Sequence, residues 1–388
     1  MPETHYDYII AGAGAAGLSL VYHLIEAGLK DKRILLLDRA PKTQNDRTWC
    51  FWEAVDGPFE AVIFQRWEQI WFYGEDFSKR LDIRPYAYKM LRGVDFYTFM
   101  GNWSAQYPNI TVRYGEIERV EEGDGGGKVW LEGQPYTADW VFSSLPQTPP
   151  QRPGRHYLLQ HFKGWVIEAA RPVFDPTAAT FMDFRVEQHG ETRFVYVLPL
   201  DKRRALVEYT LFSPGLLKPE EYDAGLRQYI SQYLGLAPEP YSVLEQEFGI
   251  IPMTDAPFAL RQSPHVMNIG TAGGRTKAST GYTFQRIQQQ SRQIAESLLR
   301  TGQPFYLISP FNRYEWFDSV LLDVLAHKRD HGKQVFTDLF RKNPPQRVLR
   351  FLDEATSLAE DWAIMTSVNV PAFALAALEV ARNRLFCR

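Results

Sequence analysis

Two glycine-rich segments are the clearest carriers of chemistry in this sequence. The first, GAGAAG, places Gly12, Gly14 and Gly17 between an apolar run and a helical run, and Asp38 follows about 20 residues later. Glycines at these positions allow a tight turn, a close approach of a pyrophosphate to the backbone, and close packing of a helix on a strand. We therefore expect the helix N-terminus to face the phosphates and Asp38 to bind the ribose of an adenosine.

The second segment is NIGTAGGRTKASTGY at 268–282, which again follows a strand-like run and precedes a long helical run. Two such ends can hold the two halves of a flavin dinucleotide, with the ADP half at the first and the ribityl and ring half at the second. The expected cofactor-binding residues of this second segment are Gly270, Gly273, Gly274 and Gly281.

A lone carboxylate, Glu208, stands in an apolar strand of the segment FVYVLPLDKRRALVEYTL at 194–211. Side chains alternate along a strand, so Glu208 shares a face with Leu206 and Phe212. A carboxylic acid in an apolar cavity has a raised pKa and can act as a general acid near neutral pH. The strand pattern equally allows a solvent-facing Glu208, or an ion pair with the arginines of the preceding turn.

The pattern of apolar residues predicts the elements that must position these groups. A strand, a helix and a second strand open the chain, strands dominate its middle, and a last buried strand and a long helix close the core. The expected ranges are 7–11, 15–28 and 33–38 for the opening, 109–142, 161–212 and 242–252 for strands, 219–236 for a helix, and 266–270 and 281–301 for the closing strand and helix.

This order predicts an α/β fold: a Rossmann-like FAD-binding unit with an inserted antiparallel sheet and C-terminal helices. We expect a discontinuous FAD-binding domain from residues 1–60, 100–155 and 255–303. The substrate domain would comprise residues 61–99 and 156–254, and the helical region residues 304–388.

Composition narrows the class of protein. The chain has 388 residues and a formal net charge of −3, so it lacks the overall positive charge that is typical of nucleic-acid-binding proteins. Its two cysteines, Cys50 and Cys387, match neither a metal spacing nor a disulfide framework, so we expect no metal site and a reducing compartment. No apolar run reaches the length of a transmembrane helix, and the N-terminus lacks the features of a signal peptide.

Four short motifs in this order resemble the bacterial flavin-dependent lycopene β-cyclase family. They are DRTWCFW (46–52), VLPLDKRRALVEYT (197–210), EFGIIPMT (247–254) and STGYTF (279–284). The two glycine-rich ends are also similar to those of a wider FAD-dependent class that includes aromatic hydroxylases and geranylgeranyl reductases. The resemblance implies FAD, active in its reduced form, with NAD(P)H as the reductant.

The resemblance also implies a catalytic role for Glu208. In that family the strand after the hairpin carries an I-E-D-T-like segment, whose first acid is the catalytic carboxylate, and Glu208 holds this position. The second acid of the family is replaced here by Tyr209, which would point to the opposite face of the strand. We therefore expect Glu208 to act as the acid alone.

Two further motifs of the family supply candidate substrate or flavin contacts. The E-x-G-x-x-P motif matches Glu247, Gly249 and Pro252, and the T-W pair matches Thr48 and Trp49. Glu247 and Trp49 are the candidates, although Glu247 as a structural hydrogen-bonding residue and Trp49 as a core residue are equally open.

The second glycine segment departs from the family at two points. The wider class has a Gly-Asp pair whose Asp binds the ribityl chain, whereas this chain has Gly270 and Thr271, so the Thr271 hydroxyl or backbone groups would substitute. The family often has His-Pro before its T-T-G-Y turn, where Lys277 and Ala278 stand here. Tyr282 of this turn is a third candidate contact.

The implied reaction is an acid-catalysed cyclisation of the ψ-end groups of lycopene to β-rings, through γ-carotene to β-carotene. A proton adds at C2, the C5–C6 double bond attacks the resulting C1 cation, and a proton leaves C6. Glu208 would supply the proton. Aromatic faces and a reduced, anionic flavin would stabilise the cation.

Two other functions stay open at this point. The chain could be an FAD-dependent hydroxylase or prenyl reductase acting on a hydrophobic isoprenoid, or a prenyl-lipid binding protein without enzymatic activity. Residues 317–342 read as an amphipathic helix with a basic face, which could lie on a membrane or cap the core. We therefore expect a cytoplasmic protein, peripheral to the inner face of the cell membrane, whose oligomeric state is open.

Overall fold

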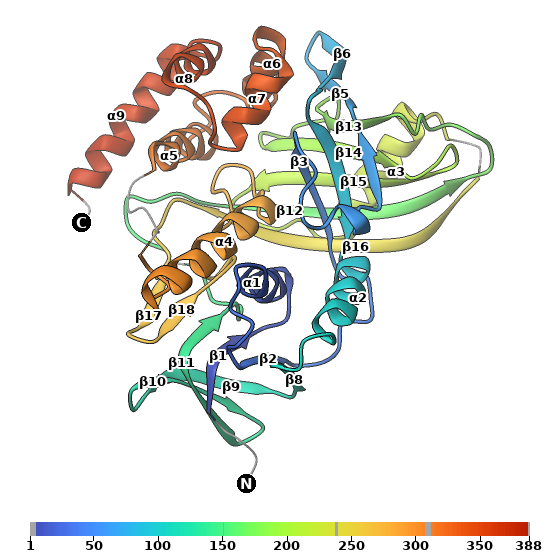
Figure 1. Ribbon diagram of the computed structural model, residues 1–388. Helices are drawn as coiled ribbons and strands as arrows, with labels where there is room; N and C mark the ends of the chain where they lie inside the picture. The colour runs from blue at the N-terminus through green and yellow to red at the C-terminus, as the bar shows by residue number, and fades with distance from the viewer. Residues whose placement is uncertain (1–4, 150, 237–239, 307–311, 387–388) are drawn as a thin grey trace.

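The computed structural model describes residues 5–149, 151–236, 240–306 and 312–386, so Cys387 lies outside the described residues. These residues form two large sheets, a small three-stranded sheet and a C-terminal group of helices (Figure 1). The predicted α/β fold, with an inserted sheet and a helical C-terminal region, is confirmed.

The first large sheet has eight strands and carries the N-terminal glycine segment. Its parallel centre forms because the runs DYIIA and ILLLD are apolar on both faces, and helices α1 (Ala15–Glu26) and α4 (Phe284–Thr301) pack against each other over it. The strand order is β17 (Arg261–Ser263), β18 (Val266–Asn268), β11 (Gln134–Ser143), β1 (His5–Ala11), β2 (Ile34–Asp38) and β8 (Ile110–Tyr114), with β9 (Ile117–Gly123) and β10 (Gly126–Leu131) extending from β11.

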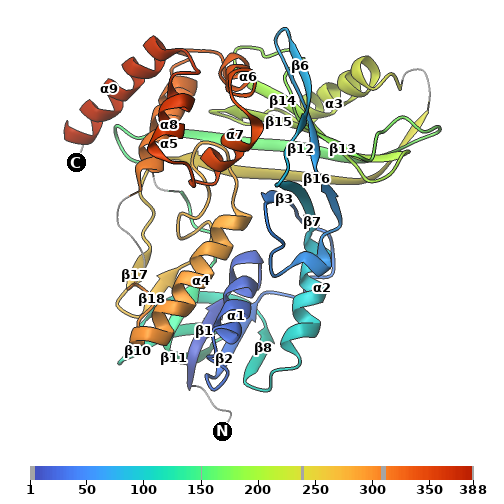
Figure 2. The same cartoon turned by 45° about the horizontal axis from the view of Figure 1, so that its top comes forward.

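The second large sheet has seven strands and is antiparallel except for the pair β13–β5. Its order is β16 (Tyr241–Thr254), β12 (Tyr157–Ala169), β15 (Arg204–Ser213), β14 (Thr192–Pro199), β13 (Ala178–Asp183), β5 (Gln69–Gly74) and β6 (Phe77–Asp82). Helix α3 (Pro219–Tyr233) covers one face, where it shares a hydrophobic cluster with β12, β14 and β15. The long strands β12, β15 and β16 lie side by side in the sheet (Figure 2).

A small sheet and one helix complete the core. The small sheet consists of β3 (Thr48–Glu53), β7 (Ala87–Arg92) and β4 (Gln65–Trp67), and α2 (Gly93–Ser104) follows it directly. Side chains of β3, β7 and α2 join those of α1 and α4 in one hydrophobic cluster. Strand β3 is thereby fixed beside the nucleotide-binding helix.

The C-terminal helices pack on the other face of the seven-stranded sheet. They are α5 (Arg313–Ala326), α6 (Gly332–Lys342), α7 (Pro345–Leu352), α8 (Leu358–Met365) and α9 (Val370–Phe386). The prediction of one amphipathic helix over 317–342 was wrong, because a loop between α5 and α6 divides this segment into two helices. The apolar side of α6 is buried: Phe336 stacks on Phe184 at 5.7 Å and Phe340 stacks on Phe72 at 4.6 Å between ring centroids.

Among the described residues, no single helix is long and apolar enough to cross a membrane. Helices α8 and α9 reach that length and hydropathy only when they are taken together, and they meet at a bend of 114°.

Candidate active site

One cavity of about 980 Å³ is lined by residues of both large sheets and the small sheet. The N-terminal glycine turn and Asp38 lie at one part of its wall, and Glu208 and Glu247 at another. The fold therefore connects the predicted nucleotide site with the predicted acid in a single space.

The turn between β1 and α1 has the geometry of a phosphate cradle. Gly12 adopts φ of +106°, and a Cβ there would lie 2.2 Å from Ser144 Oγ. A Cβ on Gly14 would meet nothing within 4 Å, so its backbone is open to the cavity. Asp38 shapes this turn because its Oδ2 accepts a hydrogen bond from the Ala13 amide at 2.7 Å.

The other predicted glycines except Gly281 serve packing rather than the cavity wall. A Cβ on Gly17 would lie 1.9 Å from the Gly12 carbonyl oxygen, and one on Gly270 would lie 2.6 Å from Ala16 Cβ. Gly273 and Gly274 abut Asn268 and Phe258 in the same way. Of the four glycines predicted in the second segment, only Gly281 lines the cavity.

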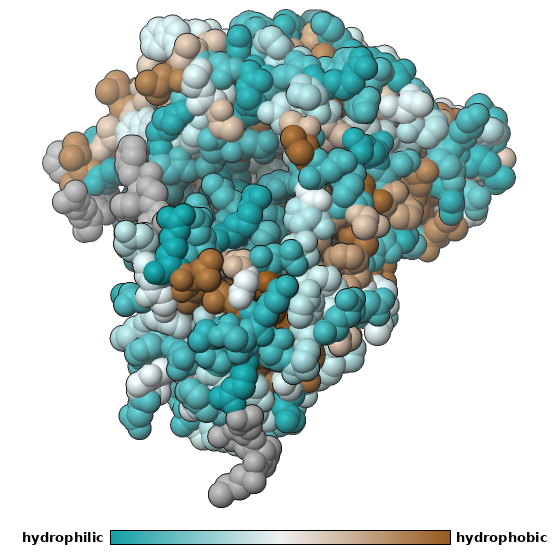
Figure 3. All heavy atoms as spheres, in the orientation of Figure 1, coloured by the Kyte–Doolittle hydropathy of each residue, from teal (hydrophilic) through white to brown (hydrophobic). Residues whose placement is uncertain are grey.

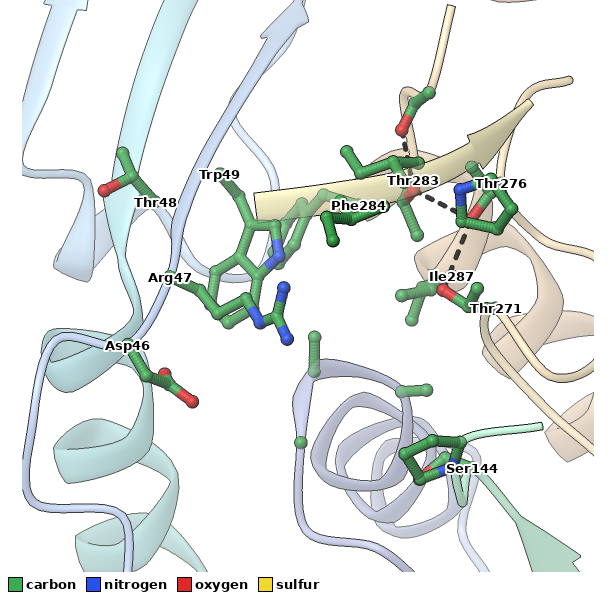
Figure 4. A pocket seen from close by; sticks show the side chains of 18 of the residues that line it. Asp46, Arg47, Thr48, Trp49, Ser144, Thr271, Thr276, Thr283, Phe284 and Ile287 are labelled. Atoms are coloured by element: carbon green, nitrogen blue, oxygen red, sulfur yellow. Dashed lines mark hydrogen bonds between the residues drawn. The ribbon is translucent and has the colours of Figure 1, made fainter. Parts of the chain in front are cut away.

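Thr271 stands where the wider FAD-dependent class has the aspartate of its Gly-Asp pair. The hydroxyls of Thr271, Thr276 and Thr283 form part of the cavity wall (Figure 4). Thr276 Oγ1 lies 3.2 Å from Thr271 Oγ1 and 3.1 Å from Thr283 Oγ1. Elsewhere in the wall, Gln160 Oε1 and Thr280 Oγ1 are buried and have no hydrogen-bond partner within the described part of the chain. A ligand rich in hydroxyl and carbonyl groups, such as the ribityl and ring half of FAD, fits this set of donors and acceptors.

Trp49 and Tyr282 both line the cavity. Trp49 extends from β3 toward the second glycine segment (Figure 4), with its ring 5.8 Å from that of Phe284. Tyr282 packs edge-on against Trp52, with 4.8 Å between the ring centroids. Arg92, at the end of β7, does not line the cavity. It pairs with Asp95 at 2.6 Å.

Glu208 points into the cavity from the middle of β15, on the face that also carries Leu206 and Thr210. Its Oε1 accepts a hydrogen bond from Thr210 Oγ1 at 2.8 Å. The turn arginines do not reach it: Arg204 pairs with Asp201 at 2.7 Å, and Arg203 with Glu168 at 3.5 Å. Glu208 is thus a cavity carboxyl without an ion pair among the described residues.

A second carboxyl, Glu247 of β16, meets Glu208 over a glycine. Strand β12 lies between β15 and β16, and its Gly164 is in register with both Glu208 and Glu247. A Cβ on Gly164 would lie 2.9 Å from Glu247 Cγ and 3.0 Å from Leu206 Cδ1. Strands β15 and β16 are two strand spacings apart, which is about 10 Å. Because Gly164 has no side chain, the Glu208 and Glu247 side chains have room to converge over it.

The two carboxyls interact with each other across Gly164. Glu247 Oε2 accepts a hydrogen bond from Thr48 Oγ1 at 2.9 Å, and Oε1 is buried with no hydrogen-bond partner among the described residues. A direct hydrogen bond between Glu208 and Glu247 requires a proton on one of them, because two ionised carboxylates cannot form such a bond.

Burial raises the pKa of both carboxyls. It raises the pKa of Glu208 well above its usual range, and the charge on Glu247 raises it further. Burial also raises the pKa of Glu247, whereas the neighbouring Glu208 and the hydrogen bond from Thr48 oppose that rise. The pair therefore keeps a proton to higher pH than an exposed carboxyl would, and the stronger rise is at Glu208.

The expectation that Glu208 stands alone is corrected by this arrangement. Tyr209 does point to the opposite face, where it packs on Gly225 of α3 and its hydroxyl accepts a hydrogen bond from Arg193 at 3.2 Å. The second carboxyl comes instead from β16, which is separated from β15 in the sequence by α3.

Comparison with known proteins agrees with this geometry. Residues 7–379 match the profile of the family described as "Lycopene cyclase protein". The chain belongs to the lycopene cyclase family. A lycopene β-cyclase from Pseudescherichia vulneris is 30% identical over 328 residues, which cover 80% of this chain and 79% of that protein. The lycopene β-cyclase of Pantoea ananas is 24% identical over 329 residues, covering 81% and 80%.

Solved structures confirm the fold of this lycopene cyclase family member. A geranylgeranyl bacteriochlorophyll reductase-like protein from Thermoplasma acidophilum covers 100% of both chains with a TM-score of 0.58 and 14% identity. An HpxO variant from Klebsiella pneumoniae, complexed with FAD, gives a TM-score of 0.60 at 15% identity and covers 90% of this chain and 98% of its own. The predicted FAD-binding fold class is therefore correct.

A buried ionic group ties the second glycine segment of this family member to the C-terminal helices. Lys277, where the family often has His, lies 3.0 Å from Asp318 of α5 and 3.1 Å from Glu354. Ser279 Oγ donates to the same Asp318 at 2.7 Å. Although burial opposes it, the charges of Lys277 and Arg286 lower the pKa of Glu354 to about 2. Lys277 thus anchors the turn that carries Thr280, Gly281 and Tyr282.

The variant Lys277→Met should be strongly destabilised. Removing this cation leaves Asp318 with the hydrogen bond from Ser279, whereas Glu354 keeps Arg286, and breaking a buried ion pair from one side costs about 3–5 kcal/mol. We expect a lower free energy of unfolding in urea and weaker FAD binding, measured by flavin fluorescence. Lys30→Met, at an exposed lysine, is the control and should change neither quantity. Equal stability of the two variants would contradict the anchoring role.

A second group consists of the buried His156 and Asp323 and the exposed His327, and its potential ligand atoms lie within 4.8 Å of one another. Hydrogen bonds already account for this group, since His156 contacts Asp255 at 3.3 Å and Asp323 at 3.1 Å, and Arg329 also binds Asp323. The sequence prediction that the chain has no metal site stays a prediction.

Proposed function

We propose that this chain is a lycopene β-cyclase that uses the Glu208–Glu247 pair as its acid. The carboxyl pair carries the proposal: Glu208, whose pKa burial raises well above its usual range, lies in a cavity that also contains the nucleotide turn. An alkene is a very weak base, so its protonation needs a carboxylic acid that keeps its proton near neutral pH.

In this proposal Glu208 delivers its proton to C2 of the terminal double bond of the substrate. The charge left on Glu208 is offset by its hydrogen bond with Thr210, and Glu247 stays fixed by Thr48. After ring closure, a proton leaves C6, and the carboxyl pair is the base present in the cavity to receive it. Aromatic side chains of the wall, among them Trp49, Tyr88 and Tyr196, present faces that stabilise a cation without trapping it.

The residues of the cavity fit FAD. Gly12, Gly14 and Asp38 would hold the ADP half, while Thr271, Gly281 and the other polar groups of the second segment would hold the ribityl and ring half. When bound in its reduced form, the flavin would supply negative charge for the cation. NAD(P)H as the reductant belongs to the same proposal, as do the three domains with the boundaries given above.

The test is a conversion assay with purified, FAD-loaded protein, lycopene in detergent, and NADPH or dithionite under anaerobic conditions. A cyclase yields γ-carotene and β-carotene of unchanged mass, which chromatography and mass spectrometry identify. A product of different mass would indicate a flavin oxidoreductase. A colourless protein that binds lycopene without converting it would indicate a lipid carrier.

The oxidoreductase is the second candidate because a geranylgeranyl bacteriochlorophyll reductase-like protein shares this fold. Isotopic labelling separates the two functions. A cyclase in heavy water incorporates deuterium from the acid but takes up no oxygen and no hydride, whereas a hydroxylase or reductase does.

A further inference from the structure

The outer faces of α8 and α9 carry a group of exposed apolar side chains. Six of them are between 49% and 74% exposed: Leu358, Trp362, Val370, Leu375, Leu378 and Leu385. Their spacing is helical, with Leu358 and Trp362 four residues apart on α8 and Leu375 and Leu378 three apart on α9. We call these six residues the α8–α9 apolar face, and brown residues mark this region at the upper left of Figure 3.

The acidic side chains of the same helices do not interrupt this face. Asp361 is buried, where it pairs with Arg313 at 2.8 Å and accepts a hydrogen bond from Thr356. Glu360 pairs with Arg350, and Glu379 pairs with Arg382. Arg382, whose side chain is 65% exposed, stands between Leu378 and Leu385 in the sequence. The α8–α9 apolar face therefore presents apolar groups, and each acid of the two helices is neutralised by an arginine.

The inner faces of the two helices pack in a hydrophobic cluster that reaches the cavity wall. Ile364 of α8 and Ala376 and Val380 of α9 lie in one hydrophobic cluster with Tyr196 and Leu206, which line the cavity. One continuous apolar layer thus extends from the cavity to helices whose outer sides are apolar as well.

We propose that the α8–α9 apolar face docks on a lipid bilayer, with the two helices lying in the interface plane. Neither helix can cross a membrane by itself, and their 114° bend suits a surface position rather than a span. An exposed apolar group of this size marks an interaction site, and α8 and α9 taken together reach the length and hydropathy of a membrane segment. The choice of a bilayer rather than a protein partner rests on the proposed function, because a C40 hydrocarbon substrate resides in lipid.

Vesicle flotation tests the docking directly. FAD-loaded wild-type protein is mixed with vesicles of phosphatidylcholine and phosphatidylglycerol and centrifuged through a density gradient. We expect it to float, and Leu375→Glu/Leu378→Glu to lose about tenfold or more of the bound fraction. Val55→Glu/Leu216→Glu is the matched control, because it places the same charges at other exposed apolar positions. Leu375→Ser/Leu378→Ser, which adds no charge, guards against misfolding, and flavin absorbance and melting temperature report the fold.

Each outcome decides for or against the docking face. Loss of flotation in both α8–α9 variants but not in the control supports the proposal. Equal flotation of all variants, or no flotation of the wild type, overturns it. A wild-type dimer that becomes a monomer in the α8–α9 variants also overturns it, because the face would then join two copies of the chain. Cyclisation of lycopene in detergent should be unchanged in these variants, so an inactive wild type that floats would refute the proposed function alone.

Discussion

Glu208→Gln should lower the rate of lycopene cyclisation by about 10³-fold or more. General acids contribute about 10²–10⁴-fold to enzymatic rates, and an amide cannot protonate an alkene. Glutamine keeps the shape of the side chain and can still hydrogen-bond to Thr210 and Glu247, so the variant should fold and bind FAD as the wild type does. The measurement is single-turnover conversion of lycopene by protein of matched flavin content.

Expression in lycopene-accumulating cells gives a second readout for the same variant. Wild-type cells should turn from red to orange-yellow, whereas cells with Glu208→Gln should stay red. If both strains made β-rings equally, the assignment of Glu208 as the acid would be wrong, although the proposed function would stand.

Glu247→Gln should shift the pH dependence of cyclisation and lower the rate about tenfold at alkaline pH. The active form of Glu208 is protonated, so activity is present below the pKa of the pair and is lost as pH rises through it. Burial is the larger cause of the raised pKa of Glu208, and the charge of Glu247 is the next. Removing that charge lowers the pKa of Glu208, and the alkaline loss of activity should move to lower pH.

The matched control for this shift is Glu220→Gln, at an exposed position in the first turn of α3. It removes the same charge without touching the carboxyl pair, so its pH profile should stay close to that of the wild type. Coincident profiles of Glu247→Gln and the wild type would argue that Glu247 is a structural residue.

Local sequence signals were sufficient for the nucleotide turn and for the faces of single strands. The GAGAAG segment, the acid at the end of β2 and the alternation in β15 depend on neighbours in the chain, and each lies where the pattern predicts. The sequence could not show which strands lie side by side. Glu208 and Glu247 are 39 positions apart in the sequence, and only the order β16–β12–β15 brings them together.

For the features that were not predicted, the sequence held at most weak signals. A glycine inside a strand indicates a close approach of other groups, and Gly164 in HFKGWVIEA is such a residue, although nothing local names the groups. The loop that separates α5 from α6 follows from packing, because both helices turn their apolar sides to the same sheet. Similarly, the acid partners of Lys277 lie on elements far along the chain, so no motif could point to them.

The Lys277 group has a consequence for how this family can vary. Two cations and two acids from four separate segments balance one another in a buried space, so a change at one position alone is penalised. Relatives with histidine in place of Lys277 should therefore lack one of the acids at positions 318 and 354. For the same reason, a chimaera that exchanges the C-terminal helices between relatives should fold only if the residue at position 277 is exchanged with them.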